Sequence, residues 1–216
     1  MISTNLQNLR EWVSKGAMAA AVSLSLVGSM AASAQTATLG LDINDDAVRL
    51  SWQQSPSTRQ IAFGASAFNH QDRGTVITGD FHIIGNAATK ARPVAAGLGG
   101  RVVYANTDLD NLPTIAIVPP PSSPTEDGYA LSIGGYFSGQ LPNYDRIGYG
   151  GHLYFSPDVL AFGDLEEFAD LWLYGSYSVL RNGDVYIGAR TLKGDFKLRG
   201  DFNFDTGVHI GFRLKF

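Results

Sequence analysis

The chain has 216 residues, with 16 Lys and Arg against 20 Asp and Glu, a formal net charge of −4, and no cysteine. This charge argues against nucleic acid as a partner, because nucleic-acid binding needs clustered basic side chains. The lack of cysteine excludes disulfides, thiolate metal ligands and thiol nucleophiles. Hydrophobic residues make up 44%, too many for a disordered chain, and charged residues only 17%, below the roughly 25% of ordinary soluble domains.

The first 34 residues have the composition of an export signal. Arg10 and Lys15 precede an apolar stretch that ends in Ala32-Ser33-Ala34. Ala32 and Ala34 are small residues at the two positions that signal peptidase requires, and the apolar stretch is shorter than the about 20 helical residues that cross a bilayer. An amphipathic or buried helix is the alternative interpretation. We expect residues 1–34 to be a cleaved signal peptide and residues 35–216 to form one mature domain.

The rest of the chain alternates between apolar and polar or small residues. At the C-terminus, Val208, Ile210, Phe212, Leu214 and Phe216 fall on one face of a strand. No later stretch is apolar for 18 residues, which argues against a helix across the inner membrane. Several runs reach the about 9–11 residues that a tilted strand needs to cross a membrane. The ten runs are 38–44, 47–54, 60–70, 75–85, 92–105, 127–138, 145–156, 167–180, 183–192 and 206–216.

The connections between these runs predict an up-and-down order. The longest gaps, 106–126, 157–166 and 193–205, all follow odd-numbered runs, as the outer loops of an outer-membrane barrel do. Arg181-Asn182-Gly183-Asp184 predicts an Asn-Gly hairpin turn on the other side, where the gap 139–144 is longer than expected. We therefore predict an all-β fold, a transmembrane antiparallel up-and-down β-barrel of about ten strands. Eight strands remain if the first two runs do not form.

The alternation also predicts which side chains face lipid and which line the lumen. The outward faces are expected to be Leu39/Leu41/Ile43, Val48/Leu50/Trp52, Ile61/Phe63/Ala65, Ile77/Phe81/Ile83, Val94/Leu98/Val102/Tyr104, Tyr129/Leu131/Ile133/Phe137, Ile147/Tyr149/Leu153/Phe155, Leu171/Leu173/Tyr177/Val179, Val185/Ile187 and the C-terminal set. The lumenal polar network is expected to comprise Asp42, Arg49, Asp80, His82, Arg101, His152, Asp170, Arg190, His209, Arg213 and Lys215.

Two interpretations of the lumen remain open. A ten-stranded barrel has a backbone radius of about 10 Å, so side chains fill most of its interior. The polar residues then form either an ion-paired core that holds the barrel shut or the wall of a narrow porin-like passage for small solutes. Interior glycines at Gly97, Gly99, Gly148 and Gly150 would favour the passage.

Four segments of the mature region resemble the YfaZ family of small Gram-negative outer-membrane proteins. They are Gly97-Leu98-Gly99-Gly100-Arg101-Val102-Val103-Tyr104-Ala105-Asn106, Ser156-Pro157-Asp158-Val159-Leu160-Ala161-Phe162-Gly163-Asp164, Val185-Tyr186-Ile187-Gly188-Ala189-Arg190 and Gly211-Phe212-Arg213-Leu214-Lys215-Phe216. The resemblance implies an outer-membrane barrel and no settled activity, so no catalytic residue is carried over. Residues Leu112–Pro124, with three consecutive prolines, look like an insertion beyond the family pattern.

Enzymatic functions are the alternatives. A rim protease would use Asp108-x-Asp110 with His70-x-Asp72, but the two pairs follow runs that are near neighbours and not opposed. A lipid hydrolase would need a serine beside a histidine on the lipid-facing side, whereas His70, His82, His152 and His209 share the lumenal face. Their spacing matches no metal motif. We expect no catalytic residue, no cofactor and no metal.

The expected partners are those of an exported barrel. Phe212, Leu214 and Phe216 have the pattern of a C-terminal signal read by the barrel-assembly machinery, and the outward faces would contact outer-membrane lipids and lipopolysaccharide. The segment Thr114–Pro121 is a stiff extended loop, a lid over the mouth, or a contact for lipopolysaccharide or another protein, which would make the chain a surface-binding barrel. The sequence leaves the oligomeric state open.

Overall fold

Ten long strands close into one antiparallel barrel in the computed structural model, which describes residues 35–56, 61–86, 94–107 and 125–216. The strands are β1 (Gln35–Ile43), β2 (Ala47–Pro56), β3 (Ile61–His70), β4 (Gly74–Asn86), β5 (Val94–Thr107), β6 (Asp127–Leu141), β7 (Tyr144–Ser156), β9 (Leu165–Leu180), β10 (Gly183–Phe196) and β11 (Gly200–Lys215). The expected signal peptide lies outside the described residues. Among those that are described, no helix has the length and apolar character needed to span a bilayer.

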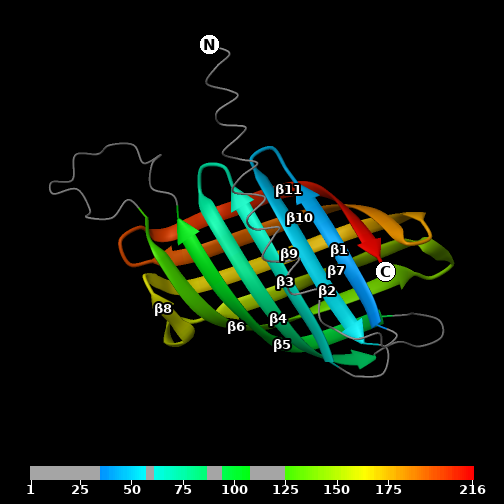
Figure 1. Ribbon diagram of the computed structural model, residues 1–216, viewed down its shortest axis with the longest axis horizontal. Coiled ribbons are helices and arrows are strands. Elements are labelled where there is room, and N and C mark those ends of the chain that lie inside the picture. Colours follow the sequence, from blue (N-terminus) through cyan, green and yellow to red (C-terminus); the bar gives the residue numbers. More distant parts are fainter. Residues whose placement is uncertain (1–34, 57–60, 87–93, 108–124) are drawn as a thin grey trace, which may run out of the picture. The chain divides into compact units, whose positions relative to one another are not determined.

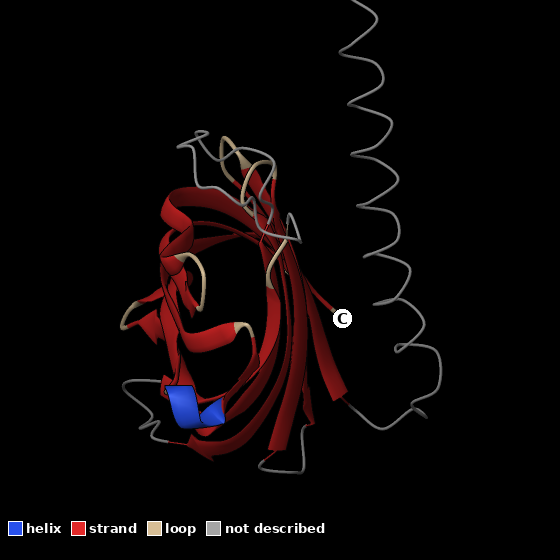
Figure 2. Cartoon of the chain, turned by 90° about the vertical axis from the view of Figure 1, so that its left-hand side faces the viewer, coloured by secondary structure: helices blue, strands red, loops and turns tan. Residues whose placement is uncertain are grey.

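Each strand pairs with its neighbours along the chain, and the last returns to the first (Figures 1 and 2). The seam runs from Thr38 opposite Lys215 to Ile43 opposite Ile210. A short strand, β8 (Ala161–Gly163), follows the 3-10 helix η1 (Asp158–Leu160) and pairs with the start of β6. The prediction of a closed ten-stranded barrel is therefore confirmed, and the eight-stranded alternative is wrong because β1 and β2 pair along nine residues.

The two ends of the barrel are distinct, and we name them by their contents. The plugged end carries the turns 44–46, 71–73 and 197–199 and the segment 157–164. The open end carries the turns 142–143 and 181–182, the start of β1 and the end of β11. Every strand runs between these two ends, as the predicted up-and-down order requires.

Along most of its length the barrel is apolar outside and polar inside. The exposed apolar side chains include Leu39, Leu41, Ile43, Phe63, Ile77, Phe81, Ile83, Leu98, Val102, Tyr129, Leu131, Ile133, Phe137, Leu153, Phe155, Leu171, Leu173, Tyr177, Val179, Val185, Ile187, Val208, Ile210 and Phe212. These are the residues that the period-two pattern assigns to the outer face, because successive side chains of a strand point to opposite sides of a sheet.

The polarity reverses at the plugged end, where one sequence prediction is wrong. Residues 193–205 were expected to be a long connection, but β10 continues to Phe196 and β11 begins at Gly200. Here the outward residues Lys193, Asp201 and Asn203 are polar and exposed, while Phe196 and its neighbours point inward. The strands continue through this region with polar residues outside and apolar residues inside. A search for outward apolar residues therefore places the ends of these strands too early.

A β-bulge adds to the irregularity of this segment. Leu192 lies opposite Asp205 and Lys193 lies opposite Asn203, so Phe204 has no partner on β10. Both Phe204 and Asp205 are buried, although a regular strand would send one of them outward. The bulge places an apolar ring and a carboxylate next to each other inside the barrel.

Two turns at the open end also differ from the prediction. The expected six-residue connection 139–144 is a tight hairpin of Pro142 and Asn143, with Asn143 in the left-handed region at φ 67°. The second hairpin centres on Arg181 and Asn182, one residue earlier than the Asn-Gly pair suggested, because Gly183 already pairs with Leu180. Both turns are short, as expected for this side of the barrel.

Candidate functional site

The interior of the barrel is the candidate site, and its contents change from one end to the other. At the plugged end the interior is apolar, and the buried residues there are Ala47, Phe68, Val76, Val103, Ala105, Ala130, Leu165, Phe168, Leu192, Phe196 and Phe204. Phe204 and Val103 are 0% exposed and Phe168 is 1% exposed. We call this set the apolar plug.

Polar contacts connect the turns and segments at the plugged end, between the apolar plug and the end of the barrel. The carboxylate of Glu126, itself buried, accepts a hydrogen bond of 3.0 Å from the backbone N–H of Leu198. The Lys197 N–H donates to the Asp164 carbonyl at 3.0 Å, and the Asp164 N–H donates to the Asp127 carbonyl at 3.1 Å. The turn 197–199 is thereby fixed to the start of β6 and to the segment before β9.

Between the plug and the open end lies a layer of buried ion pairs, which we call the ion-pair layer. It has two parts. In the first part, the Arg49 Nε donates to Asp42 at 2.7 Å and the Arg190 guanidinium donates to Asp205 at 2.6 Å. Arg190 also lies 3.8 Å from Asp42, which accepts a hydrogen bond from the Tyr186 hydroxyl. This part joins β1, β2, β10 and β11.

The second part of the ion-pair layer crosses the lumen. Arg101 on β5 donates to Asp80 on the neighbouring strand at 2.6 Å and to Asp170 on β9, which is not a neighbour of β5 in the sheet. His152 lies 2.9 Å from the same Asp170 carboxylate. Burying charges is costly unless they are paired and hydrogen-bonded, so this pairing fixes the distance between β5 and β9, two strands that are not neighbours in the sheet.

Aromatic rings join the two parts. Trp172 lies 5.2 Å from the His152 ring, carries the Arg49 guanidinium 4.5 Å above its own ring, and donates its indole N–H to His209 at 2.6 Å. In the second part of the ion-pair layer, the Arg101 guanidinium lies 3.7 Å from the centre of the Tyr154 ring. These cation–π contacts leave little space between the charged groups.

Several interior glycines accommodate aromatic rings, whereas Gly148 faces the Ser176 hydroxyl and lines the open part of the lumen. A Cβ at Gly97 would lie 2.5 Å from the ring of Tyr136, its direct partner on β6. A Cβ at Gly150 would lie 2.5 Å from the hydroxyl of Tyr174, its direct partner on β9. The same cross-strand arrangement occurs at Gly134 with Tyr154, at Gly188 with His209 and at Gly211 with Tyr186. The expectation that Gly97 and Gly150 favour a passage is therefore wrong, because the rings occupy the space that these glycines leave.

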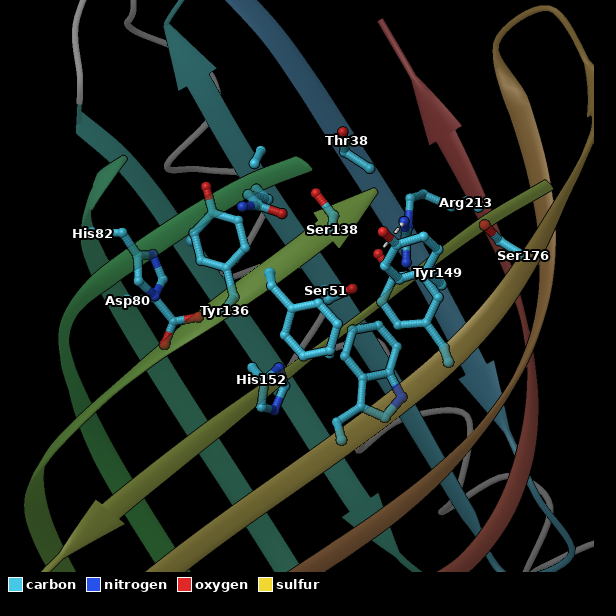
Figure 3. A pocket seen from close by; sticks show the side chains of 18 of the residues that line it. Thr38, Ser51, Asp80, His82, Tyr136, Ser138, Tyr149, His152, Ser176 and Arg213 are labelled. Carbon is cyan, nitrogen blue, oxygen red and sulfur yellow. Dashed lines mark hydrogen bonds between the residues drawn. The ribbon is translucent and has the colours of Figure 1, made fainter. Parts of the chain in front are cut away.

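Towards the open end the lumen widens into a pocket of about 690 Å³. Its wall carries hydroxyl, amide and aromatic groups and reaches inward to Asp80, Arg101 and His152 of the ion-pair layer (Figure 3). Thr38, Ser51, Ser138 and Ser176 line it together with Arg213. The pocket ends at the ion-pair layer, beyond which lies the apolar plug.

The structure brings the predicted polar residues together inside the barrel. Asp42, Arg49, His82, Arg101, Asp170, Arg190 and His209 are buried, Asp80, His152 and Arg213 are partly buried, and Lys215 lies at the open end, 2.7 Å from Asp184. Sequence reasoning missed Asp184, Asp205, Tyr154, Tyr186 and Trp172 as members of this network. Four of them could have been found, because each occupies a strand position that the alternation assigns to the lumen. Asp205 could not, because the bulge turns both Phe204 and Asp205 inward and breaks the alternation.

The residues considered for catalysis have other surroundings. The Nδ1 atom of His70 accepts a hydrogen bond of 3.1 Å from the backbone N–H of Asp72, within the turn 71–73. Asp108 and Asp110 lie outside the described residues. Within the described ranges, no group of three or more His, Cys, Asp and Glu side chains is arranged to hold a metal ion.

Comparisons with known proteins give one family and one solved structure. The family model described as "YfaZ precursor" matches residues 13–216. No curated protein matches the sequence. Among solved structures, one titled "KdgM porin" is similar at a TM-score of 0.39 and 8% identity, over 84% of this chain and 99% of that chain.

Proposed function

The chain belongs to the YfaZ family, and from this premise we propose that it is a non-enzymatic barrel of the bacterial outer membrane whose lumen is closed to solutes. In this proposal residues 1–34 direct export and are removed, and residues 35–216 form the membrane domain. The plugged end faces the outside of the cell and the open end faces the periplasm, since the first strand of an exported barrel starts on the periplasmic side.

The outer face supports a membrane location. It is apolar on every long strand, and Leu98, Ile133 and Ile210 are more than 60% exposed, which is unfavourable in water over so large an area. Aromatic residues lie towards both ends of this face. Among the exposed aromatic side chains, Tyr129, Phe155 and Phe162 lie towards the plugged end, and Phe63, Phe137, Tyr177 and Phe212 lie towards the open end. Such belts mark the two interfaces of a bilayer.

The apolar plug is the observation that carries the closed lumen. Its innermost side chains are almost fully shielded from solvent, as the exposed fractions of Phe204, Val103 and Phe168 show. A dry apolar layer cannot hydrate a passing ion, and no polar groups within it replace the hydration shell. The ion-pair layer adds a second barrier, because its charged side chains are buried and paired with one another.

Recording in a planar lipid bilayer tests this proposal. The refolded protein is expected to give no stepwise conductance over a range of voltages in concentrated salt, which maximises the current of any open channel. A known porin recorded in the same chamber is the positive control. Regular current steps from the unmodified protein would contradict the closed lumen.

A narrow passive channel is the second candidate, and the pocket favours it. The pocket of about 690 Å³ already opens a large part of the lumen, so that within the described part of the chain the plug and the ion-pair layer are what separates the two ends. A channel would require the plug to move. The same recording decides between the candidates, since a channel gives current steps without any substitution.

The C-terminus supports the proposed use of the barrel-assembly machinery. The backbone N–H of Phe216 donates to the Ala37 carbonyl at 2.8 Å, so the terminal residue closes the seam between β11 and β1. Its side chain is exposed on the outer face. We expect deletion of Phe216 to lower the amount of folded protein in the outer-membrane fraction of cells, while in-vitro refolding into detergent is less affected.

A further inference from the structure

Arg213 stands out among the charged residues of the lumen. It lies on β11 near the open end, where its guanidinium is 4.6 Å from the Tyr174 ring centre and 5.0 Å from the Tyr186 ring centre. One of its N–H groups donates to the Tyr174 hydroxyl at 3.2 Å. The rings hold the planar group in place, and it lines the pocket (Figure 3).

The other cations of the pocket each have a carboxylate. Arg49 pairs with Asp42, Arg101 pairs with Asp80 and Asp170, and Lys215 pairs with Asp184. No carboxylate of the described residues lies within 4.0 Å of the Arg213 guanidinium, and the carboxylate that acts on it from a greater distance, Asp184, is already paired with Lys215. A half-buried guanidinium with unused N–H donors is the group that binds carboxylate and phosphate oxygens in a two-pronged geometry.

The surroundings of Arg213 suit a small polar ligand. Ser138 and Ser176 line the same pocket, and neither hydroxyl takes part in a hydrogen bond recorded among the described residues. The volume of about 690 Å³ falls within the range of small-molecule sites, about 300–1,000 Å³. The pocket thus combines one cation without a carboxylate in ion-pair contact, hydroxyl groups without a hydrogen bond among the described residues, and an aromatic wall.

We propose that this pocket is a binding site for a small organic anion, whose carboxylate or phosphate group pairs with Arg213 and whose remainder is held by the Ser138 and Ser176 hydroxyls. The ligand enters from the open end and does not pass the ion-pair layer. The site rests on the geometry of the lumen alone, and only the side of entry, the periplasm, rests on the proposed function.

Calorimetric titration of the full chain in detergent tests the site. Three probes are used: succinate, inorganic phosphate and succinamide, which has the size of succinate without its charge. We expect saturable binding of succinate, of phosphate or of both, and none of succinamide. Tighter binding of succinate would indicate a ligand with a carboxylate group, and tighter binding of phosphate would indicate a ligand with a phosphate group. Equal heats from all three probes would overturn the proposal.

Substitutions locate the binding. Arg213→Gln is expected to weaken binding at least tenfold, and Arg213→Lys, which keeps the charge without the planar group, is expected to weaken it less. Arg146→Gln is the matched control, because Arg146 is exposed at the same end and does not line the pocket. Unchanged affinity in Arg213→Gln, or an equal loss in Arg146→Gln, would contradict the assignment.

A further variant keeps the test decisive if Arg213→Gln does not fold. Ser138→Phe fills the pocket and leaves Arg213 in place, and it is expected to abolish binding while the protein still migrates as a folded barrel on an unheated gel. Full binding by this folded variant would contradict the site. The bilayer recording remains separate, because current steps would overturn the closed lumen without affecting the binding result.

Discussion

The plugged end and the open end of this barrel share the same strands but have opposite polarity. Near the open end β10 and β11 present Val185, Ile187 and Ile210 outward and keep polar groups inside. At the plugged end the same two strands present Lys193 and Asn203 outward and pack Phe196 and Phe204 inside. In the proposed membrane location, the solvent outside explains the difference, because hydrocarbon favours outward apolar residues and water favours inward ones.

The two regions are therefore held together by different forces. The plug is stabilised by apolar burial and ring packing, as in a soluble domain, with the Phe196 and Phe204 rings 6.0 Å apart. The ion-pair layer is stabilised by charge pairing that is favourable only while every partner is present. Substitutions in the plug should thus open the lumen, and substitutions in the ion-pair layer should loosen its walls.

The largest effect is expected from Phe196→Ala combined with Phe204→Ala. Each substitution removes a fully buried ring, which costs about 3–5 kcal/mol of unfolding free energy. The cavity should also allow current steps in a bilayer where the unmodified protein gives none. Phe155→Ala is the control, since this ring is exposed on the outer face near the same end, and a loss of about 1 kcal/mol is expected there. A silent double variant would show that the ion-pair layer alone seals the lumen.

The next largest effect is expected in the ion-pair layer. Asp170→Asn removes the carboxylate that Arg101 and His152 share, and breaking a buried pair costs about 3–5 kcal/mol. Urea titration in lipid vesicles, followed by tryptophan fluorescence, measures the loss. The triple variant Asp80→Asn, Arg101→Met and Asp170→Leu should recover most of it, because Asp80 and Asp170 are the two carboxylates that pair with Arg101 and none of the three charges is left unpaired. If the triple variant is as unstable as Asp170→Asn, the charges contribute through a specific geometry that apolar packing does not replace.

A smaller effect is expected where a lumenal glycine meets a ring. Gly97→Val places a Cβ against Tyr136 and should cost about 1–3 kcal/mol through overpacking. Gly79→Val is the matched control on β4, since a Cβ there meets nothing within 4 Å, and its stability should change by about 0.5 kcal/mol or less. The same urea titration compares the two. Equal losses would mean that the cost comes from the strand backbone and not from the ring.

The smallest effect is expected from Lys215→Met at the open end. The Lys215 side chain is 40% exposed where it pairs with Asp184, and exposed pairs contribute about 0–1 kcal/mol. Stability measured in low and in high salt should differ little between this variant and the unmodified protein. A loss as large as that of Asp170→Asn would show that the open end is as tightly enclosed as the ion-pair layer.

Much of the fold followed from period-two alternation. Residues such as Leu39, Ile133 and Ile210 could be assigned to the outer face because neighbouring side chains of a strand point to opposite sides, and the apolar outer face makes that division visible in the sequence. The prediction ended β10 too early at Leu192 because it assumed one solvent along the whole strand. The prediction also missed the bulge. Phe204 followed by Asp205 has the apolar-polar alternation of a regular strand, so the sequence gives no local signal that both side chains point inward.

The sequence by itself determined that the chain forms a barrel of about ten strands with these two faces, since that information is local and repeats along the strands, and the pairing of β1 with β2 in the structure excluded the eight-stranded alternative. Only the tertiary structure decided what fills the inside. Which carboxylate meets Arg101, which ring covers Gly97 and whether Arg213 has a counterion depend on strands that approach one another across the lumen. Such contacts follow from closure and register, and no periodicity within a single strand records them.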